Sequence, residues 1–61
     1  MQPDEFLEIR LALQLTQAAL AAVMESDTRT VRRWENGERE IPGPVRVLMR
    51  MLMRTAPVPP A

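Results

Sequence analysis

The chain has 61 residues with no cysteine and no histidine, and eight arginines balance eight acidic residues, so the formal net charge is zero. A chain of this length forms one small domain at most. Disulfides and thiolate metal sites are excluded, and histidine, the commonest metal ligand and general base, is missing. No apolar run approaches the roughly 20 residues of a membrane span, and the first residues are acidic rather than basic. We therefore expect a soluble, cytoplasmic protein that is not an enzyme and binds no metal, cofactor or small molecule.

Two helices are predicted in the first half of the chain, over residues 3–14 and 17–24. Pro3 suits the first position of a helix, the acids that follow it complement the helix dipole, and apolar residues recur at helical spacing from Phe6 onward. Thr16 is a typical N-cap for the second, alanine-rich helix. That helix is too short to be stable alone, so it must pack against its neighbours.

A third helix is predicted over residues 28–36. It follows a break in the apolar pattern at which either Ser26 or Asp27 can serve as the N-cap. Gly37 suits the position just after the C-cap, because glycine adopts a left-handed conformation without steric cost.

The spacing of Val31 and Trp34 on this third helix predicts that both face inward. The alternative role for Trp34 is a stacking platform for single-stranded nucleic acid. An inward position and the lack of an aromatic partner favour the core instead. The outer side of the helix then carries Thr28, Arg29, Arg32 and Arg33.

A last helix is predicted over residues 44–54, and residues 55–61 are expected to form a disordered, proline-rich tail. Its predicted core face is Val45, Leu48, Met49 and Leu52, and its basic stripe is Arg46, Arg50 and Arg54. The apolar residues left over are Val47, Met51 and Met53. In so small a domain they indicate a homodimer interface. The alternative is that adaptable methionines fill the core around a missing fifth helix.

The distribution of charge along the chain is asymmetric. Between Thr28 and Arg54 there are seven arginines and three glutamates, whereas the first eight residues hold three acids and no base. For a charged partner this asymmetry matters more than the net charge. The sequence therefore predicts an all-α domain over residues 1–54, with a helix-turn-helix in its middle and a basic second half.

Two segments of the chain resemble the motif of a known family. The segments "LTQAALAAVM" and "TVRRWENGE" resemble the lambda-repressor-like helix-turn-helix family, also called the Cro/C1-type or XRE family. The family pattern is met by Leu15, Thr16, Gln17, Leu20, Ala21, Val31, Trp34, Glu35 and Gly37. The resemblance covers roughly residues 6–53 and implies a domain whose third helix enters the major groove of DNA.

The resemblance also implies roles for individual polar residues. Thr28, Arg29 and Arg33 are expected at base edges, with Arg32 nearer the flank of the groove. Gln17 and Asn36 are expected to contact phosphates. The complete set expected on DNA is Thr16, Gln17, Thr28, Arg29, Thr30, Arg32, Arg33, Asn36 and Arg39.

Arg10 and Glu35 match positions that form a partly buried ion pair in this family; the alternative is a weak, exposed pair. Gln14 and Glu25 stand where the family usually has glycine. If they keep a left-handed conformation, each costs on the order of 1 kcal/mol. Otherwise the turn itself differs and tilts the recognition helix. Many relatives have a fifth helix, and the sequence predicts four helices here.

The leading hypothesis is a sequence-specific, double-stranded DNA-binding regulator of transcription. It would act as a repressor, bind an inverted-repeat operator as a homodimer, and serve phage, plasmid or toxin–antitoxin-type genes. The alternative is a protein-interaction module whose helix 44–54 binds a toxin, a polymerase or a nucleoid protein.

Overall fold

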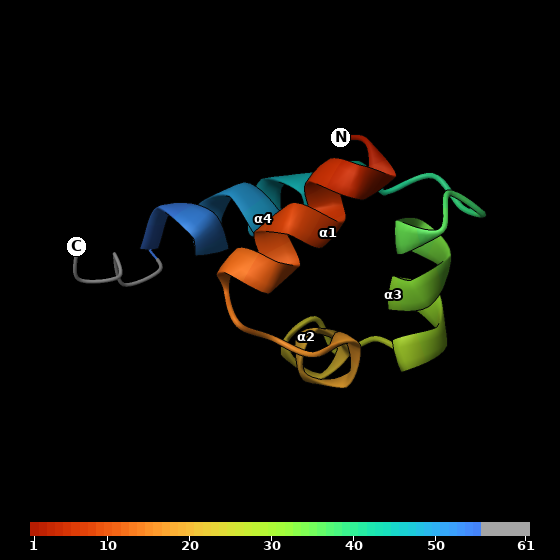
Figure 1. Ribbon diagram of the computed structural model, residues 1–61, viewed down its shortest axis with the longest axis horizontal. Coiled ribbons are helices and arrows are strands. Elements are labelled where there is room, and N and C mark those ends of the chain that lie inside the picture. Colours follow the sequence, from red (N-terminus) through yellow and green to blue (C-terminus); the bar gives the residue numbers. More distant parts are fainter. Residues whose placement is uncertain (56–61) are drawn as a thin grey trace.

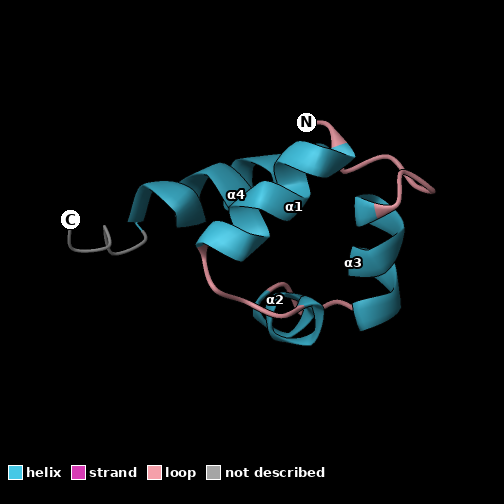
Figure 2. Cartoon of the chain, in the orientation of Figure 1, coloured by secondary structure: helices cyan, strands magenta, loops and turns pink. Residues whose placement is uncertain are grey.

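The computed structural model describes residues 1–55, and within that range all regular structure is helical (Figures 1 and 2). The four helices are α1 (Pro3–Ala12), α2 (Gln17–Val23), α3 (Thr28–Glu35) and α4 (Gly43–Thr55). Helices α1 and α4 lie side by side, and α2 packs against α3 (Figure 1). The predicted all-α, four-helix fold is confirmed.

Helices α1, α2 and α3 all end with the residue after the C-cap in a left-handed conformation. The φ angles are 59° at Gln14, 54° at Glu25 and 75° at Gly37. In each case the N–H groups of this residue and of the next one donate to carbonyls of the last helical turn, which is the Schellman motif. Because of these caps, α1 stops at Ala12 and α2 at Val23, slightly earlier than predicted. The turns thus keep the left-handed geometry although two of the three lack glycine.

The two non-glycine caps give a first prediction. Replacing Gln14 and Glu25 together by glycine is expected to stabilise the domain by about 1–2 kcal/mol, because the relief of left-handed strain exceeds the entropic cost of glycine. In a domain of this size that corresponds to a melting temperature about 4–16 °C higher. Thermal unfolding followed by circular dichroism measures it. The matched Gln14→Ala/Glu25→Ala variant keeps both β-carbons and should show no such gain. An equal gain in the alanine variant would contradict the explanation.

The side chain of the N-cap residue makes a capping hydrogen bond in α2 but not in α3. The Thr16 hydroxyl accepts a hydrogen bond from the Ala19 N–H at 3.0 Å, so the predicted cap of α2 is confirmed. Asp27 rather than Ser26 is the N-cap residue of α3, but its side chain makes no capping hydrogen bond. The first N–H groups of α3 are therefore left without a side-chain partner from their own cap.

The core is small and draws on all four helices and the loop between α3 and α4. Its buried members are Phe6, Leu20, Ala21, Val31, Trp34, Ile41 and Met49. The rings of Phe6 and Trp34 meet edge to face, with centroids 5.9 Å apart, a favourable arrangement for aromatic pairs. Trp34 is 5% exposed, so its predicted place in the core is confirmed. Ala21 is 2% exposed, as expected for a small residue in a helix that packs closely on another.

Helix α4 is longer than predicted by one residue at each end. It begins at Gly43 and includes Thr55, which the sequence had assigned to the tail. The Thr55 hydroxyl donates to the Met51 carbonyl at 3.0 Å, so the last turn satisfies this side chain internally. The rest of the predicted tail, residues 56–61, lies outside the described residues.

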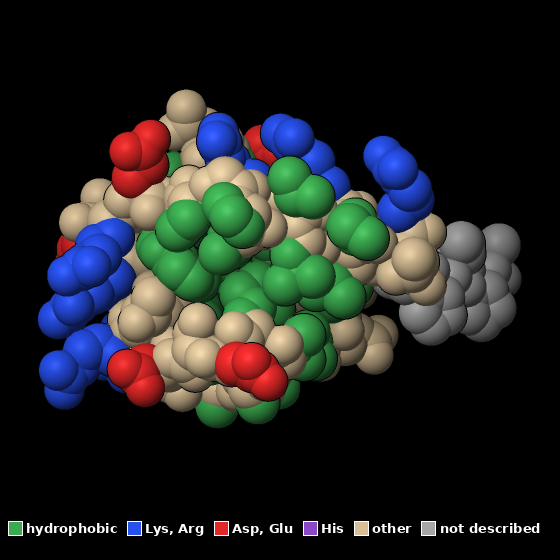
Figure 3. Space-filling view, turned by 180° about the vertical axis from the view of Figure 1, so that it is seen from behind, with side chains coloured by type: hydrophobic (Ala, Val, Ile, Leu, Met, Phe, Trp, Pro, Cys, Tyr) green, Lys and Arg blue, Asp and Glu red, His purple; other side chains and the backbone are tan. Residues whose placement is uncertain are grey.

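The apolar residues of α4 divide between the core and the surface. Met49 is buried, whereas Val47 is 54%, Met51 56% and Met53 46% exposed. Val47 and Met51 are four residues apart and so share one side of the helix, the side opposite Met49. Met53 points elsewhere and lines a shallow groove with Ile9, Arg50 and Arg54. Figure 3 shows that apolar side chains form a broad patch on the back of the molecule.

No single helix within residues 1–55 is long and apolar enough to cross a membrane. Helices α1 and α2 reach the required length and hydropathy only when taken together, across a 90° bend.

Candidate nucleic-acid interface

Helix α3 has one buried side and one basic side. Val31 and Trp34 are buried, and this fixes the rotation of the helix about its own axis. The opposite side carries exposed Arg29 and Arg32 and half-buried Arg33. Basic side chains gather at the edge of the molecule where α3 lies (Figure 3). The burial of two apolar residues therefore aims three arginines away from the core.

The arginines of α3 are not committed to partners inside the domain. Among residues 1–55, the guanidinium groups of Arg29, Arg32 and Arg33 make no hydrogen bond and no ion pair; the one ion pair joins Arg10 to Glu35. A guanidinium has five donors and no acceptor, so these groups are suited to a partner rich in acceptors.

Arg10 and Glu35 join α1 to the last turn of α3. Arg10 Nε donates to Glu35 Oε2 at 2.5 Å, and Arg10 Nη2 donates to Glu35 Oε1 at 3.1 Å. The two side chains are only 12% and 6% exposed. Arg10 Nη1 also donates to the Leu15 carbonyl at 2.8 Å. This is the geometry of a bidentate, largely buried pair, rather than the weak exposed pair that was the alternative.

Gln17 extends this network to α2. Its Nε2 donates to Glu35 Oε1 at 3.0 Å, so the Glu35 carboxylate contacts side chains from both α1 and α2. Gln17 is expected from the sequence to contact phosphate, and its bond to Glu35 is not predicted. Eighteen residues separate Gln17 from Glu35, and the only signal for their contact was that both belong to one family motif.

The remaining expected contact residues lie beside α3 or at the start of α2. Thr28 and Thr30 are half-buried on α3, and Asn36, the C-cap of α3, is exposed. Thr16 is exposed, although its hydroxyl is engaged as the cap of α2.

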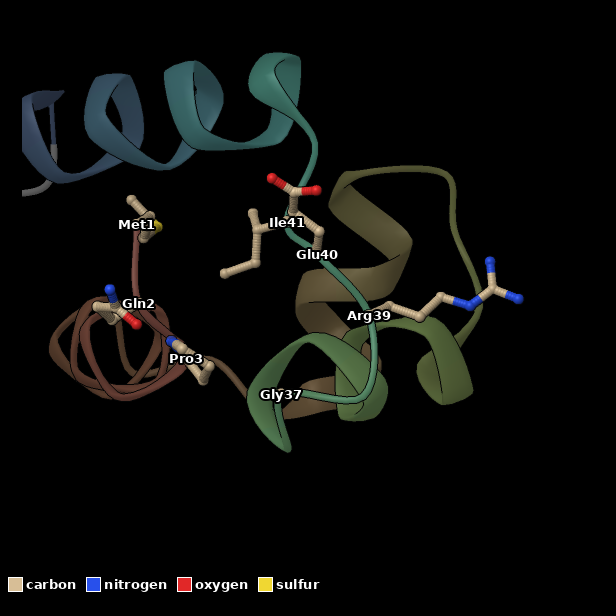
Figure 4. A pocket seen from close by; sticks show the side chains of 7 residues that line it. All are labelled: Met1, Gln2, Pro3, Gly37, Arg39, Glu40 and Ile41. Carbon is tan, nitrogen blue, oxygen red and sulfur yellow. The ribbon is translucent and has the colours of Figure 1, made fainter.

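Arg39 follows α3 in the loop, where its N–H donates to the Arg33 carbonyl. A groove between the N-terminus and this loop is lined by Met1, Gln2, Pro3, Gly37, Arg39, Glu40 and Ile41. Figure 4 shows the Arg39 side chain pointing away from that groove, so that its charge is presented outward. Gly37 lies near Pro3 in this groove: a β-carbon added to Gly37 would lie 3.6 Å from the Pro3 ring, an ordinary van der Waals contact.

In the part of the chain that the structure describes, no group of three or more acidic side chains is placed to hold a metal ion.

Comparison with known proteins agrees with this architecture. The helix-turn-helix family profile matches residues 7–45, which is more than half of the chain and includes α2, α3 and the turn between them. No curated protein and no solved structure gives a significant match. The family is one of DNA-binding regulators rather than enzymes. With four helices, a capped α2 and a basic α3 in this arrangement, the chain belongs to the lambda-repressor-like, or XRE-type, helix-turn-helix family.

Proposed function

We propose that this protein is a sequence-specific repressor of transcription that inserts α3 into the major groove of duplex DNA. The observation that carries the proposal is the pair of faces on α3, where buried Val31 and Trp34 direct three unpartnered arginines outward. The major groove admits an α-helix and presents a distinct pattern of donors and acceptors at each base pair. A helix presented in this way has the shape and the chemistry to read it.

The surrounding residues supply contacts to the DNA backbone in this proposal. Thr16, Gln17, Asn36 and Arg39 lie around α3 and contact phosphates, and Arg32 contacts the flank of the groove. Such contacts set register and carry no sequence information of their own. Thr28, Thr30, Arg29 and Arg33 are left for the base edges.

A homodimer on an inverted repeat is part of the proposal. Val47 and Met51 form an apolar stripe on the side of α4 that the core leaves uncovered. A twofold axis through such a stripe places each residue opposite its own copy or its neighbour. The dimer would present two α3 helices to two half-sites, and a bound dimer over a promoter excludes polymerase without further surfaces. Acting on DNA places the protein at the nucleoid, in the cytoplasm.

The interface gives a prediction of its own. Met51→Glu is expected to convert the dimer to a monomer, because the twofold axis brings the two introduced carboxylates together. Light scattering of the purified protein should show the mass halved. Met53→Glu is the matched control, because Met53 lies in the groove beside Ile9 and off the stripe, and the dimer should survive it. A wild-type protein that is monomeric at all accessible concentrations contradicts the dimer.

The experiment that tests the function is selection of bound duplexes from a random pool with the wild-type protein. The expected result is an enriched inverted repeat whose half-sites are about 34–36 Å apart centre to centre, or a multiple of that distance. The exposed stripe of α4 also suits a docking helix for another protein, which is the second candidate function. That candidate predicts that no sequence is enriched, and this outcome would overturn the proposal.

A further inference from the structure

Arg29 and Arg33 form a row along the outward side of α3. They are four residues apart and so lie one above the other on the helix, on the side away from the buried pair Val31 and Trp34. Arg29 is exposed and Arg33 is half-buried, and exposed Arg32 lies on the other flank of Arg29. The row that runs along this side of the helix is therefore made of two arginines.

Arginine restricts which bases this surface can read. Its guanidinium carries only donors, so it needs acceptors. In the major groove guanine offers two adjacent acceptors, N7 and O6, which match the guanidinium fork. Adenine pairs one acceptor with a donor, thymine offers one acceptor beside a methyl group, and cytosine offers a donor. A fork of donors at the centre of the helix thus favours guanine over the other three bases.

The spacing of the two arginines sets the spacing of their targets. Residues four apart on an α-helix are separated by about 6 Å along the axis. Successive base pairs are separated by about 3.4 Å. Because a helix in the major groove follows the groove rather than the DNA axis, side chains four residues apart meet bases one or two steps apart.

The packing of α3 fixes the backbone positions of both arginines before DNA binds. The Arg33 carbonyl accepts the N–H groups of Glu38 at 2.9 Å and of Arg39 at 3.4 Å, which anchors the end of α3. Glu35, on the same turn, is bonded to Arg10 at 2.5 Å. A helix fixed at its end and along its buried side presents its arginines with little freedom of rotation, so they discriminate by geometry as well as by charge.

From these features we infer that Arg29 and Arg33 each bind one guanine, and that the half-site of this protein contains two G·C pairs one or two base steps apart. The inference rests on the proposed function and makes it more specific. Half-sites that contain only A·T pairs are excluded as operators.

The test combines single variants with a single-atom change in the DNA. The motif selected by wild-type protein is synthesised with 7-deazaguanine at one guanine at a time, which removes the N7 acceptor and keeps Watson–Crick pairing. Wild type is expected to lose about 2- to 13-fold in affinity at each of the two guanines, about half the free energy of a bidentate contact, because the O6 acceptor remains. The affinity of Arg29→Ala should become insensitive to 7-deazaguanine at one of the two positions, and that of Arg33→Ala at the other. Each variant should remain sensitive at the guanine that the remaining arginine binds. Arg29→Lys should keep a weaker preference for guanine than wild type, because an ammonium also donates to N7 and O6 but lacks the planar fork of the guanidinium.

The possible results distinguish a failure of this inference from a failure of the proposed function. A selected motif with no guanine in the half-site overturns the inference and leaves sequence-specific binding intact. The same holds if 7-deazaguanine has no effect at any position, or if the two variants respond alike at every position. A selection that enriches no sequence overturns the proposed function, and the inference with it. Circular dichroism of each variant shows that it is folded, which is expected because both side chains project from the surface.

Discussion

Replacing Glu35 by alanine is expected to unfold much of the population at room temperature. The variant leaves the Arg10 guanidinium, 12% exposed, without its carboxylate, and removes the acceptor of Gln17 Nε2. Breaking a buried ion pair by removing one partner costs about 3–5 kcal/mol. Single domains are stable by roughly 0.05–0.15 kcal/mol per residue, or about 3–9 kcal/mol for a chain of this length. Urea unfolding, followed by the fluorescence of Trp34, measures the loss.

A double variant distinguishes the effect of the two charges on stability from the effect of the volume that the two side chains fill. Arg10→Met with Glu35→Leu replaces both charges by apolar side chains of similar size, and such replacements are often neutral or stabilising. We expect the double variant to be several kcal/mol more stable than the single one. If Glu35→Ala instead stays within about 1 kcal/mol of wild type, the pair behaves as a surface ion pair, and its role in joining α1 to α3 is contradicted.

The elements of the fold could be predicted because their signals are local. Val31 and Trp34 are spaced for a helix buried on one side, and Thr16 and Gly37 mark a beginning and an end. The same spacing places Trp34 in the core rather than on a nucleic acid. No such signal marks Ile41, which is 5% exposed although it lies in a loop between charged residues and prolines. Its burial depends on how the chain returns from α3 to pack α4 on α1, and no local pattern carries that information.

The residue types of the candidate site could be predicted better than the hydrogen bonds between them. Helical spacing is enough to say that Arg29 and Arg33 face away from Val31. It does not say that Gln17 donates to Glu35, because that bond depends on how α2 crosses α3. The left-handed residues Gln14 and Glu25 are a similar case. Their backbone is set by the geometry of the turn, which the packed helices hold against the preference of the side chain.

The largest expected effect on binding comes from removing both central arginines of α3. Arg29→Ala with Arg33→Ala should lower affinity for the selected operator by between about 30-fold and about 10⁴-fold, since each bidentate contact contributes about 1–3 kcal/mol. Affinity for random duplex should fall much less, because phosphate contacts from residues such as Arg32 and Arg39 remain. Equilibrium titrations at one fixed salt concentration measure both affinities, since the electrostatic part of binding varies steeply with salt.

The matched control is Arg50→Ala with Arg54→Ala, which removes the same charge from the groove that α4 forms beside Ile9. Loss of charge alone weakens all duplexes together, because the attraction to phosphate does not depend on sequence. The α4 variant should therefore lower the affinities for operator and random duplex by the same modest factor and leave their ratio unchanged. The α3 variant should bring the ratio close to one. If the two variants change the ratio equally, the arginines of α3 contribute only charge, and base reading must be assigned to other side chains.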